Sequence, residues 1–303
     1  MNVRTLAEQH KQQIIAWRRE IHACPEVAWA EQTTSDKVAT ELQSMGLTVT
    51  RLSPSGVIGV LSGKGPGKTV ALRADMDALA IAEASDLPYK STKPGAMHAC
   101  GHDGHTAMLL GAAKICSELR HEFCGTIKFL FQPAEEIGLG ALKMLEAGIM
   151  QDVDAILGLH LWPDLPSGTV SMVAGPRMAS ADKLKITVRG KASHGSMPHQ
   201  GSDAILAASA IIMNLQSVSS REIAPLEPAV VTIGKLAGGT GWNITCDEVM
   251  LEGTTRCFSH EVRKVLPAAI ERIIKNTAAT FRAQAEMEYI AILPPLINDP
   301  QIA

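Results

Sequence analysis

The segment that decides the fold is TIKFLFQPAEEIGLGALKMLEAGIMQDVDAILGLHL, residues 126–161. It begins with a β-rich run (126–131) and ends with a nearly all-apolar run (155–161), which is typical of a strand buried on both faces. Between them, residues 141–147 have a helical pattern that stops at Gly148. A strand, a helix and a second strand in this order indicate an α/β fold with a mostly parallel sheet.

The residues upstream continue the same alternation of helices and strands. Helical periodicity covers residues 5–45 with a break at Cys24 and Pro25, strands are predicted at 57–61 and 69–76, and a further helix is predicted at 106–119. We therefore expect a first domain over residues 1–178, built on an α/β sheet.

From about residue 179 the predicted elements change to strand, helix, strand, strand, helix, strand. This βαββαβ order is that of the ferredoxin-like α+β fold, in which two helices back an antiparallel sheet. We expect this second domain to cover residues 179–290.

Composition excludes several classes of function. The 303 residues include 46% hydrophobic residues, and 28 Lys+Arg stand against 31 Asp+Glu, for a net charge of -3. Such a balance provides no bulk attraction to nucleic acid or to anionic membranes. The first 20 residues lack the apolar core of a signal peptide, and the six cysteines form no CxxC pair. We expect a cytoplasmic protein with no nucleic acid or membrane partner.

Side chains that can bind a metal follow three predicted strands, and others come from a glycine-rich loop before a helix. The first set is Asp75, Asp77, Glu135, Glu136 and His160, and the second is Cys100, His102 and His105. Ligands of open α/β sheets bind at the carboxyl ends of the strands. A mixture of thiolate, imidazole and carboxylate suits Zn²⁺ and similar ions better than Mg²⁺ or Ca²⁺.

The adjacent carboxylates Glu135 and Glu136 would repel each other near a buried strand end if both were idle. If one binds a metal and the other accepts a proton from water, the metal charge compensates both. The pair therefore favours a metal-dependent hydrolase with one carboxylate as general base. Taken singly, each candidate group also fits a structural role, and it is their joint occurrence that favours a metal site.

Six motifs make the sequence similar to the M20 metallopeptidase superfamily. They are LRADMDAL (72–79), MHACGHDGHTAML (97–109), FQPAEE (131–136), GLHLWP (158–163), GKASHGSMPH (190–199), and the pair Asn243 and Arg256 in GGTGWNIT and LEGTTR. Within the superfamily they resemble the amidohydrolase branch, which includes hippurate hydrolases, N-acyl-amino-acid amidohydrolases and plant auxin-conjugate hydrolases. The resemblance implies hydrolysis of a hippurate-like N-acyl or N-aroyl amino acid to a carboxylic acid and an amino acid.

The resemblance also implies roles for the candidate residues of the first domain. Two divalent ions per subunit (Zn, Mn, Co or Ni) would be bound by Cys100, which bridges them, and by His102, Glu136 and His160. Glu135 would be the catalytic base. Asp75 and Asp77 would lie behind the ligands, where Asp77 orients a ligand histidine.

In the second domain, the resemblance implies that His194 polarises the scissile carbonyl in the neighbouring subunit's site. Asn243 and Arg256 would bind the α-carboxylate of the substrate, for which a guanidinium group is well shaped. The second domain would thus be an inserted lid through which a homodimer forms.

Family members continue for several dozen residues beyond a PP-x-x-ND segment like residues 294–299, and supply one more metal-binding histidine there. We therefore expect residues 291–303 to begin the return to the catalytic domain in a C-terminally truncated chain. Two alternatives to the amidohydrolase are a peptidase of the same superfamily acting on dipeptides or on a free C-terminal residue, and a truncated remnant with impaired catalysis.

Overall fold

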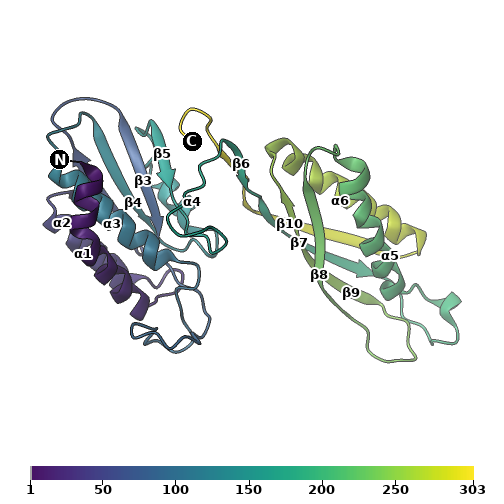
Figure 1. Ribbon diagram of the computed structural model, residues 1–303. Helices are drawn as coiled ribbons and strands as arrows, with labels where there is room; N and C mark the ends of the chain where they lie inside the picture. The colour runs from purple at the N-terminus through teal and green to yellow at the C-terminus, as the bar shows by residue number, and fades with distance from the viewer. Residues whose placement is uncertain (1) are drawn as a thin grey trace. The chain divides into compact units, whose positions relative to one another are not determined.

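The protein is described here by a computed structural model that covers residues 2–303. The chain divides into two compact units, a first one up to Thr169 and a second one from Val170 to Ala303. Each unit has its own sheet, helices and core (Figure 1). Among the described residues, no helix combines the length and the apolarity that crossing a bilayer requires.

The first unit is built on a five-stranded sheet with the order β1-β2-β4-β3-β5. The strands are β1 (Thr48–Leu52), β2 (Gly56–Ser62), β3 (Thr69–Asp75), β4 (Thr126–Gln132) and β5 (Ala155–Gly158). β3 pairs in parallel with β4 and β5, whereas β2 is antiparallel to both β1 and β4. Only β2 therefore runs against the other strands, and the predicted α/β fold with a mostly parallel sheet is confirmed.

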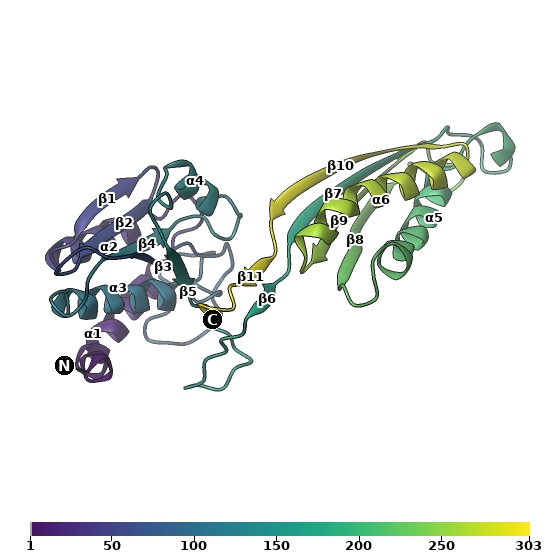
Figure 2. The same ribbon diagram turned by 90° about the horizontal axis from the view of Figure 1, so that it is seen from above.

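Helices cover both faces of this sheet (Figure 2). They are α1 (Val3–Ala23), α2 (Gln32–Ser44) and α3 (His102–Glu118) on one face, and α4 (Gly140–Glu146) on the other. Because successive side chains of a strand point to opposite faces, Phe129 and Phe131 of β4 enter the core under α1–α3. Leu130 enters the smaller core that includes Met144 of α4.

Two boundaries differ from the sequence prediction. α3 begins at His102 and not at residue 106, because Gly101 adopts the left-handed conformation (φ 92°) and turns the chain into the helix. β5 ends at Gly158, and it is an edge strand whose residues 156–158 are exposed. The expectation that residues 155–161 form a strand buried on both faces was therefore wrong, because β5 pairs with β3 alone among the described strands.

The second unit contains a four-stranded antiparallel sheet with the order β10-β7-β9-β8. Its elements in chain order are β7 (Ala181–Arg189), α5 (Ala204–Ser217), β8 (Ala229–Gly238), β9 (Glu248–Cys257), α6 (His260–Thr280) and β10 (Gln284–Leu293). This is the predicted βαββαβ order, and both long helices lie on one face of the sheet (Figure 2). A 3₁₀ turn (Pro198–Gln200) and a short π-helix (Val218–Glu222) flank α5.

Two further strands extend this unit. β6 (Gly175–Met178) pairs antiparallel with β11 (Leu296–Asn298). Neither strand was predicted from the sequence, nor was β1, because a run of three to five residues is too short to display a period of two clearly.

Asp182, a buried carboxylate on β7, connects this strand to α6 and to β10. Asp182 accepts hydrogen bonds from Arg263 Nε (2.9 Å) and Nη2 (2.6 Å) on α6. It also accepts from the Tyr289 hydroxyl (2.9 Å) and from the Ile292 backbone N–H (2.9 Å) on β10. Burial alone would raise the pKa of Asp182, but these donors hold it below its ordinary value.

Asp182→Asn should destabilise the second unit by about 3 kcal/mol at pH 7, because it removes one member of a buried, hydrogen-bonded ion pair. Hydrogen exchange at β7 and β10, followed by mass spectrometry, measures the effect. Since the folded pKa is lowered, the stabilisation is present at neutral pH and fades below about pH 4. The gap between wild type and variant should therefore shrink at pH 3.

The matched control is Glu288→Gln, which breaks an exposed pair with Lys185 between the same two strands. It should change protection by less than about 0.5 kcal/mol. Equal protection of Asp182→Asn and wild type at pH 7 would show that the Asp182 network adds nothing to stability.

Candidate metal centre

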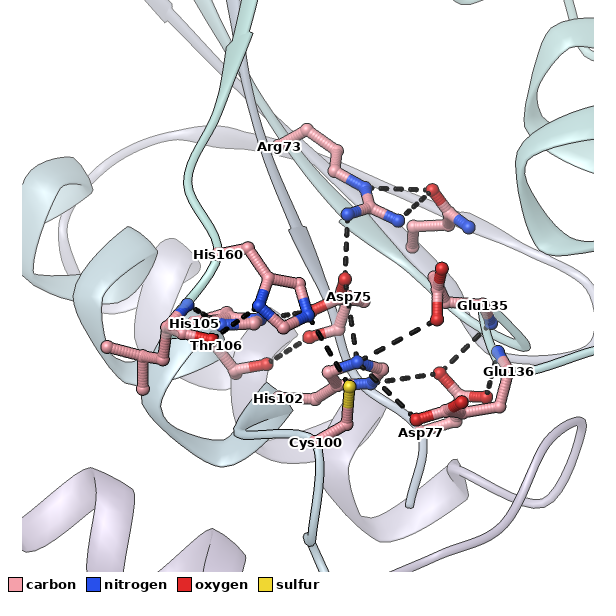
Figure 3. A network of polar contacts seen from close by, with 12 residues as sticks. Arg73, Asp75, Asp77, Cys100, His102, His105, Thr106, Glu135, Glu136 and His160 are labelled. Atoms are coloured by element: carbon pink, nitrogen blue, oxygen red, sulfur yellow. Dashed lines mark hydrogen bonds and ion pairs between the residues drawn. The ribbon is translucent and has the colours of Figure 1, made fainter. Parts of the chain in front are cut away.

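Three strand ends and one helix start bring the predicted site residues of the first unit together (Figure 3). β3 ends at Asp75, and β4 and β5 end just before the segments that carry the two glutamates and His160. Since β3, β4 and β5 are parallel, their carboxyl ends lie at the same edge of the sheet. The first turn of α3 adds His102, which is fully buried.

Four carboxylates surround His102. The distances from its Nε2 are 3.7 Å to Asp75 Oδ2, 3.7 Å to Glu136 Oε1 and 3.8 Å to Glu135 Oε2, and its Nδ1 is 3.3 Å from Asp77 Oδ1. Burial alone would lower the pKa of His102, but the neighbouring Asp77 and Cys100 side chains and the charge of Asp75 raise it to about 11. The site therefore attracts positive charge.

A thiol and a second imidazole face this histidine. Cys100 Sγ lies 3.4 Å from His160 Nε2, and the Nδ1 of His160 is 2.6 Å from the Leu161 carbonyl oxygen. The side chains of His102 and His160 lower the pKa of the Cys100 thiol. The contact with Cys100 in turn raises the pKa of His160. Cys100 is thus biased toward the thiolate form that binds metals.

Buried atoms at the centre of the cluster lack hydrogen bonds. Both ring nitrogens of His102 and Oε1 of Glu136 are buried without a hydrogen-bond partner. Three groups of potential ligands share His102, and the ligand atoms within each group lie within 4.8 Å of one another: Cys100 with His160, Asp75 with His105, and Glu135 with Glu136. Unpaired buried polar atoms are costly, and a divalent cation would satisfy these. The donor set of sulfur, nitrogen and oxygen fits Zn²⁺ and related ions.

The turn that carries Glu135 and Glu136 is held by hydrogen bonds from its backbone to two buried carboxylates. The carboxylate of Asp77 accepts hydrogen bonds from both backbone N–H groups, each at 3.0 Å. Ala134 has a positive φ of 51°, and its N–H donates to Glu31 Oε1 at 2.8 Å. Glu31 is fully buried. Glu31 was not predicted from the sequence, because no local pattern distinguishes it from other glutamates between helices.

Asp75 is paired on both of its oxygens. Oδ2 accepts from Arg73 Nη1 at 2.7 Å, and Oδ1 is 2.6 Å from His105 Nδ1. Burial would raise the pKa of Asp75, but these partners hold it well below its ordinary value. Arg73 also donates to the side chain of Gln132, and so the positive charge of this motif residue lies beside the acidic cluster.

In the second unit, the structure brings two of the three predicted residues together. The loops of His194 and Asn243 are joined by the Gly195 N–H donating to the Asn243 carbonyl (2.7 Å), and both side chains are exposed. Arg256 is exposed at the other end of β9, eight residues beyond its start at Glu248. At about 3.3 Å per residue, Arg256 lies roughly 26 Å along the strand from Glu248.

Known proteins resemble the whole chain. The profile of peptidase family M20/M25/M40 matches residues 71–303. An N-acyl-L-amino acid amidohydrolase of Geobacillus stearothermophilus is 44% identical over 298 residues, which are 98% of this chain and 80% of that protein. An N-acetylcysteine deacetylase of Bacillus subtilis is 43% identical over 288 residues, 94% of this chain and 76% of that protein.

The fold is shared with solved structures of the same family. The crystal structure of a dinuclear metal-binding M20 peptidase from Bacillus subtilis has a TM-score of 0.86 and 38% sequence identity, covering 97% of this chain and 77% of that one. The profile match and the similarity to amidohydrolases along nearly the whole chain agree with the cluster at the strand ends. This chain belongs to peptidase family M20/M25/M40.

Proposed function

We propose that the protein hydrolyses the amide bond of N-acyl or N-aroyl amino acids such as hippurate, with two divalent metal ions in the cluster around His102. The observation that carries the proposal is the convergence of two adjacent glutamates, a thiol and a second histidine on one buried imidazole. The names of the amidohydrolase and deacetylase relatives support the same class of substrate.

Cys100, His102, Glu136 and His160 would hold the metal ions, which we expect to be Zn, Mn, Co or Ni. Glu136 suits this role because its Oε1 is buried and makes no hydrogen bond. When bound, the ions lower the pKa of water and polarise a carbonyl group. Asp77 contacts both the His102 ring and the backbone of the glutamate turn, and so it fixes the position of one relative to the other.

Glu135 is the proposed base. Its side chain is 33% exposed, against 20% for Glu136, and so it is the glutamate that a substrate reaches more easily. Burial and the charge of Asp75 raise the pKa of Glu135, which makes the carboxylate a better proton acceptor. It takes a proton from water as the new C–O bond forms, and delivers a proton to the amine nitrogen as the C–N bond breaks.

His194, Asn243 and Arg256 would act on the substrate from the second unit. His194 would donate to the carbonyl oxygen as negative charge develops on it, and Asn243 and Arg256 would bind the α-carboxylate. Since Arg256 lies at the opposite end of β9 from the other two, one copy of this unit cannot present all three residues to one small substrate.

We therefore propose a homodimer in which each site takes residues from both second units. Two features support this. β8 is an edge strand of the four-stranded sheet, and the outer face of α5 exposes apolar side chains, among them Leu206 (54%) and Met213 (72%). A second copy placed along this side would cover that apolar surface.

A peptidase is the second candidate function. A thermostable carboxypeptidase of Saccharolobus solfataricus is 40% identical over 294 residues. Substrates of such an enzyme, like N-acyl amino acids, have a free α-carboxylate. The two kinds of substrate differ on the acyl side of the amide bond. Relative turnover of hippurate, an N-acetyl amino acid and a dipeptide distinguishes the two.

The first test measures benzoate release from hippurate after addition of Mn²⁺, Zn²⁺ or Co²⁺, together with metal content. Wild type should turn over acyl amino acids faster than dipeptides. Glu135→Gln should lower kcat by about 10²–10⁴-fold and keep its metal, because only the proton acceptor is lost. The neighbouring Glu136→Gln is the matched comparison and should lose metal. If Glu135→Gln loses metal instead, the two roles are reversed.

Cys100→Ala should reduce the metal content of the purified chain from about two ions to one or fewer, because a thiolate that would hold metal is removed. Elemental analysis after dialysis against a fixed metal concentration measures this. Cys124→Ala is the control, since this cysteine is exposed and outside the cluster. An unchanged metal content in Cys100→Ala would exclude the thiol as a ligand.

Mixed dimers test the shared site. His194→Ala and Arg256→Ala should each be inactive alone, whereas their co-expressed mixture should recover about a quarter of wild-type activity, because half of the dimers are mixed and each has one intact site. Sedimentation should show a dimer for every variant. A mixture as inactive as the separate variants would indicate sites that are complete within one chain.

A further inference from the structure

His105 lies one turn after His102 on α3 and belongs to the acidic cluster, yet both of its ring nitrogens are already engaged. Nδ1 is 2.6 Å from Asp75 Oδ1, and Nε2 accepts a hydrogen bond from the Leu161 backbone N–H at 2.8 Å. The ring is 2% exposed. A nitrogen that accepts from an N–H has no lone pair left for a metal, so His105 is poorly placed to be a ligand.

The contact defines the tautomer of His105. Because Nε2 accepts, the proton is on Nδ1, from which it is donated to Asp75. Asp75 is itself fixed by Arg73 through its other oxygen, and the Thr106 hydroxyl donates to its backbone carbonyl at 2.8 Å. The acceptor nitrogen of His105 is therefore aimed at one backbone N–H that lies 56 residues further along the chain.

Leu161 connects this contact to His160. Its carbonyl oxygen receives the His160 Nδ1–H at 2.6 Å, which leaves the lone pair of His160 Nε2 facing Cys100 Sγ. The side chain of Leu161 lies over the first turn of α3, where a β-carbon on Gly104 would come within 2.6 Å of its Cδ1. Leu161 is thus held through its N–H by His105 and through its side chain by the same helix.

We propose that His105 is a positioning residue that presents His160 to the metal, through the series Asp75, His105, the Leu161 backbone and His160. Figure 3 shows the side chains of Asp75, His105 and His160. The inference rests on the proposed metal-dependent function. β5 ends at Gly158, so His160 follows the last paired residue by two positions and has no strand pairing of its own. The hydrogen bond from the Leu161 N–H to His105 supplies the anchor that the sheet does not.

The test titrates the metal-free 303-residue chain with Co²⁺, and follows the visible bands of the ion and the thiolate-to-cobalt band. His105→Asn retains a donor toward Asp75 but has no atom at the position of Nε2, and should weaken Co²⁺ binding by about 10–100-fold. His105→Gln places an acceptor near the Nε2 position and should restore affinity close to wild type. His121→Asn, an exposed histidine of the same unit, should bind as wild type does.

A double-mutant cycle distinguishes positioning from direct ligation. His160→Ala and His105→Asn/His160→Ala should have the same affinity and spectrum, because His105 acts only through His160. Additive losses, with no recovery in His105→Gln, would make His105 a ligand and overturn the proposal. Unchanged binding by His105→Asn would overturn it as well.

A readout without metal separates this inference from the proposed function. In ¹⁵N-histidine-labelled, metal-free protein, the His105 resonances, assigned by their loss in His105→Gln, should show a protonated Nδ1 and an unprotonated Nε2. A protonated Nε2 would overturn the positioning role. Wild type that binds no Co²⁺ but shows the expected tautomer would refute the proposed metal centre while retaining the contact of His105 with Leu161.

Discussion

The crowding of four carboxylates around the buried ring of His102 is the constraint on which the rest of the first unit depends. Like charges gathered around one buried ring repel each other. The fold tolerates them because each has a compensating partner: Arg73 and His105 for Asp75, two backbone N–H groups for Asp77, and His102 for the glutamates. A cation is the remaining compensation, and the unpaired atoms of His102 and Glu136 indicate where it belongs.

Backbone geometry, and not side-chain flexibility, keeps the carboxylates in place. Ala134 adopts a left-handed conformation that most residues avoid, and the buried carboxylate of Glu31 holds its N–H there. The backbone at Gly140 packs against Pro133 so closely that a β-carbon at position 140 would overlap the Pro133 carbonyl. The two glutamates therefore project from a rigid turn, which suits groups that must differ in role while being neighbours in sequence.

Much of this arrangement could be predicted because it follows from strand ends. Asp75 ends β3, Glu135 and His160 follow the ends of β4 and β5 within three residues, and parallel strands bring their carboxyl ends to one edge. The βαββαβ order of the second unit could also be predicted, because its helices and strands are long enough to display their periodicity.

Other features were not predictable, because they depend on contacts between distant residues. Glu31 and Ala134 are 103 residues apart, and no local pattern predicts their hydrogen bond. His105 belongs to the same motif as His102 and appeared equally suited to bind metal, until the Leu161 N–H was found on its second nitrogen.

The pairing of β6 with β11 has a consequence for how such a chain can change. The ladder that joins β7 to β10 is followed by one that joins Met178 to Leu296, so the two ends of the ferredoxin-like body are side by side. A body whose ends are adjacent can be removed, and a short turn can close the gap without moving the flanking residues. The ferredoxin-like body is thus an exchangeable module, and a different domain could be spliced between the same two strands.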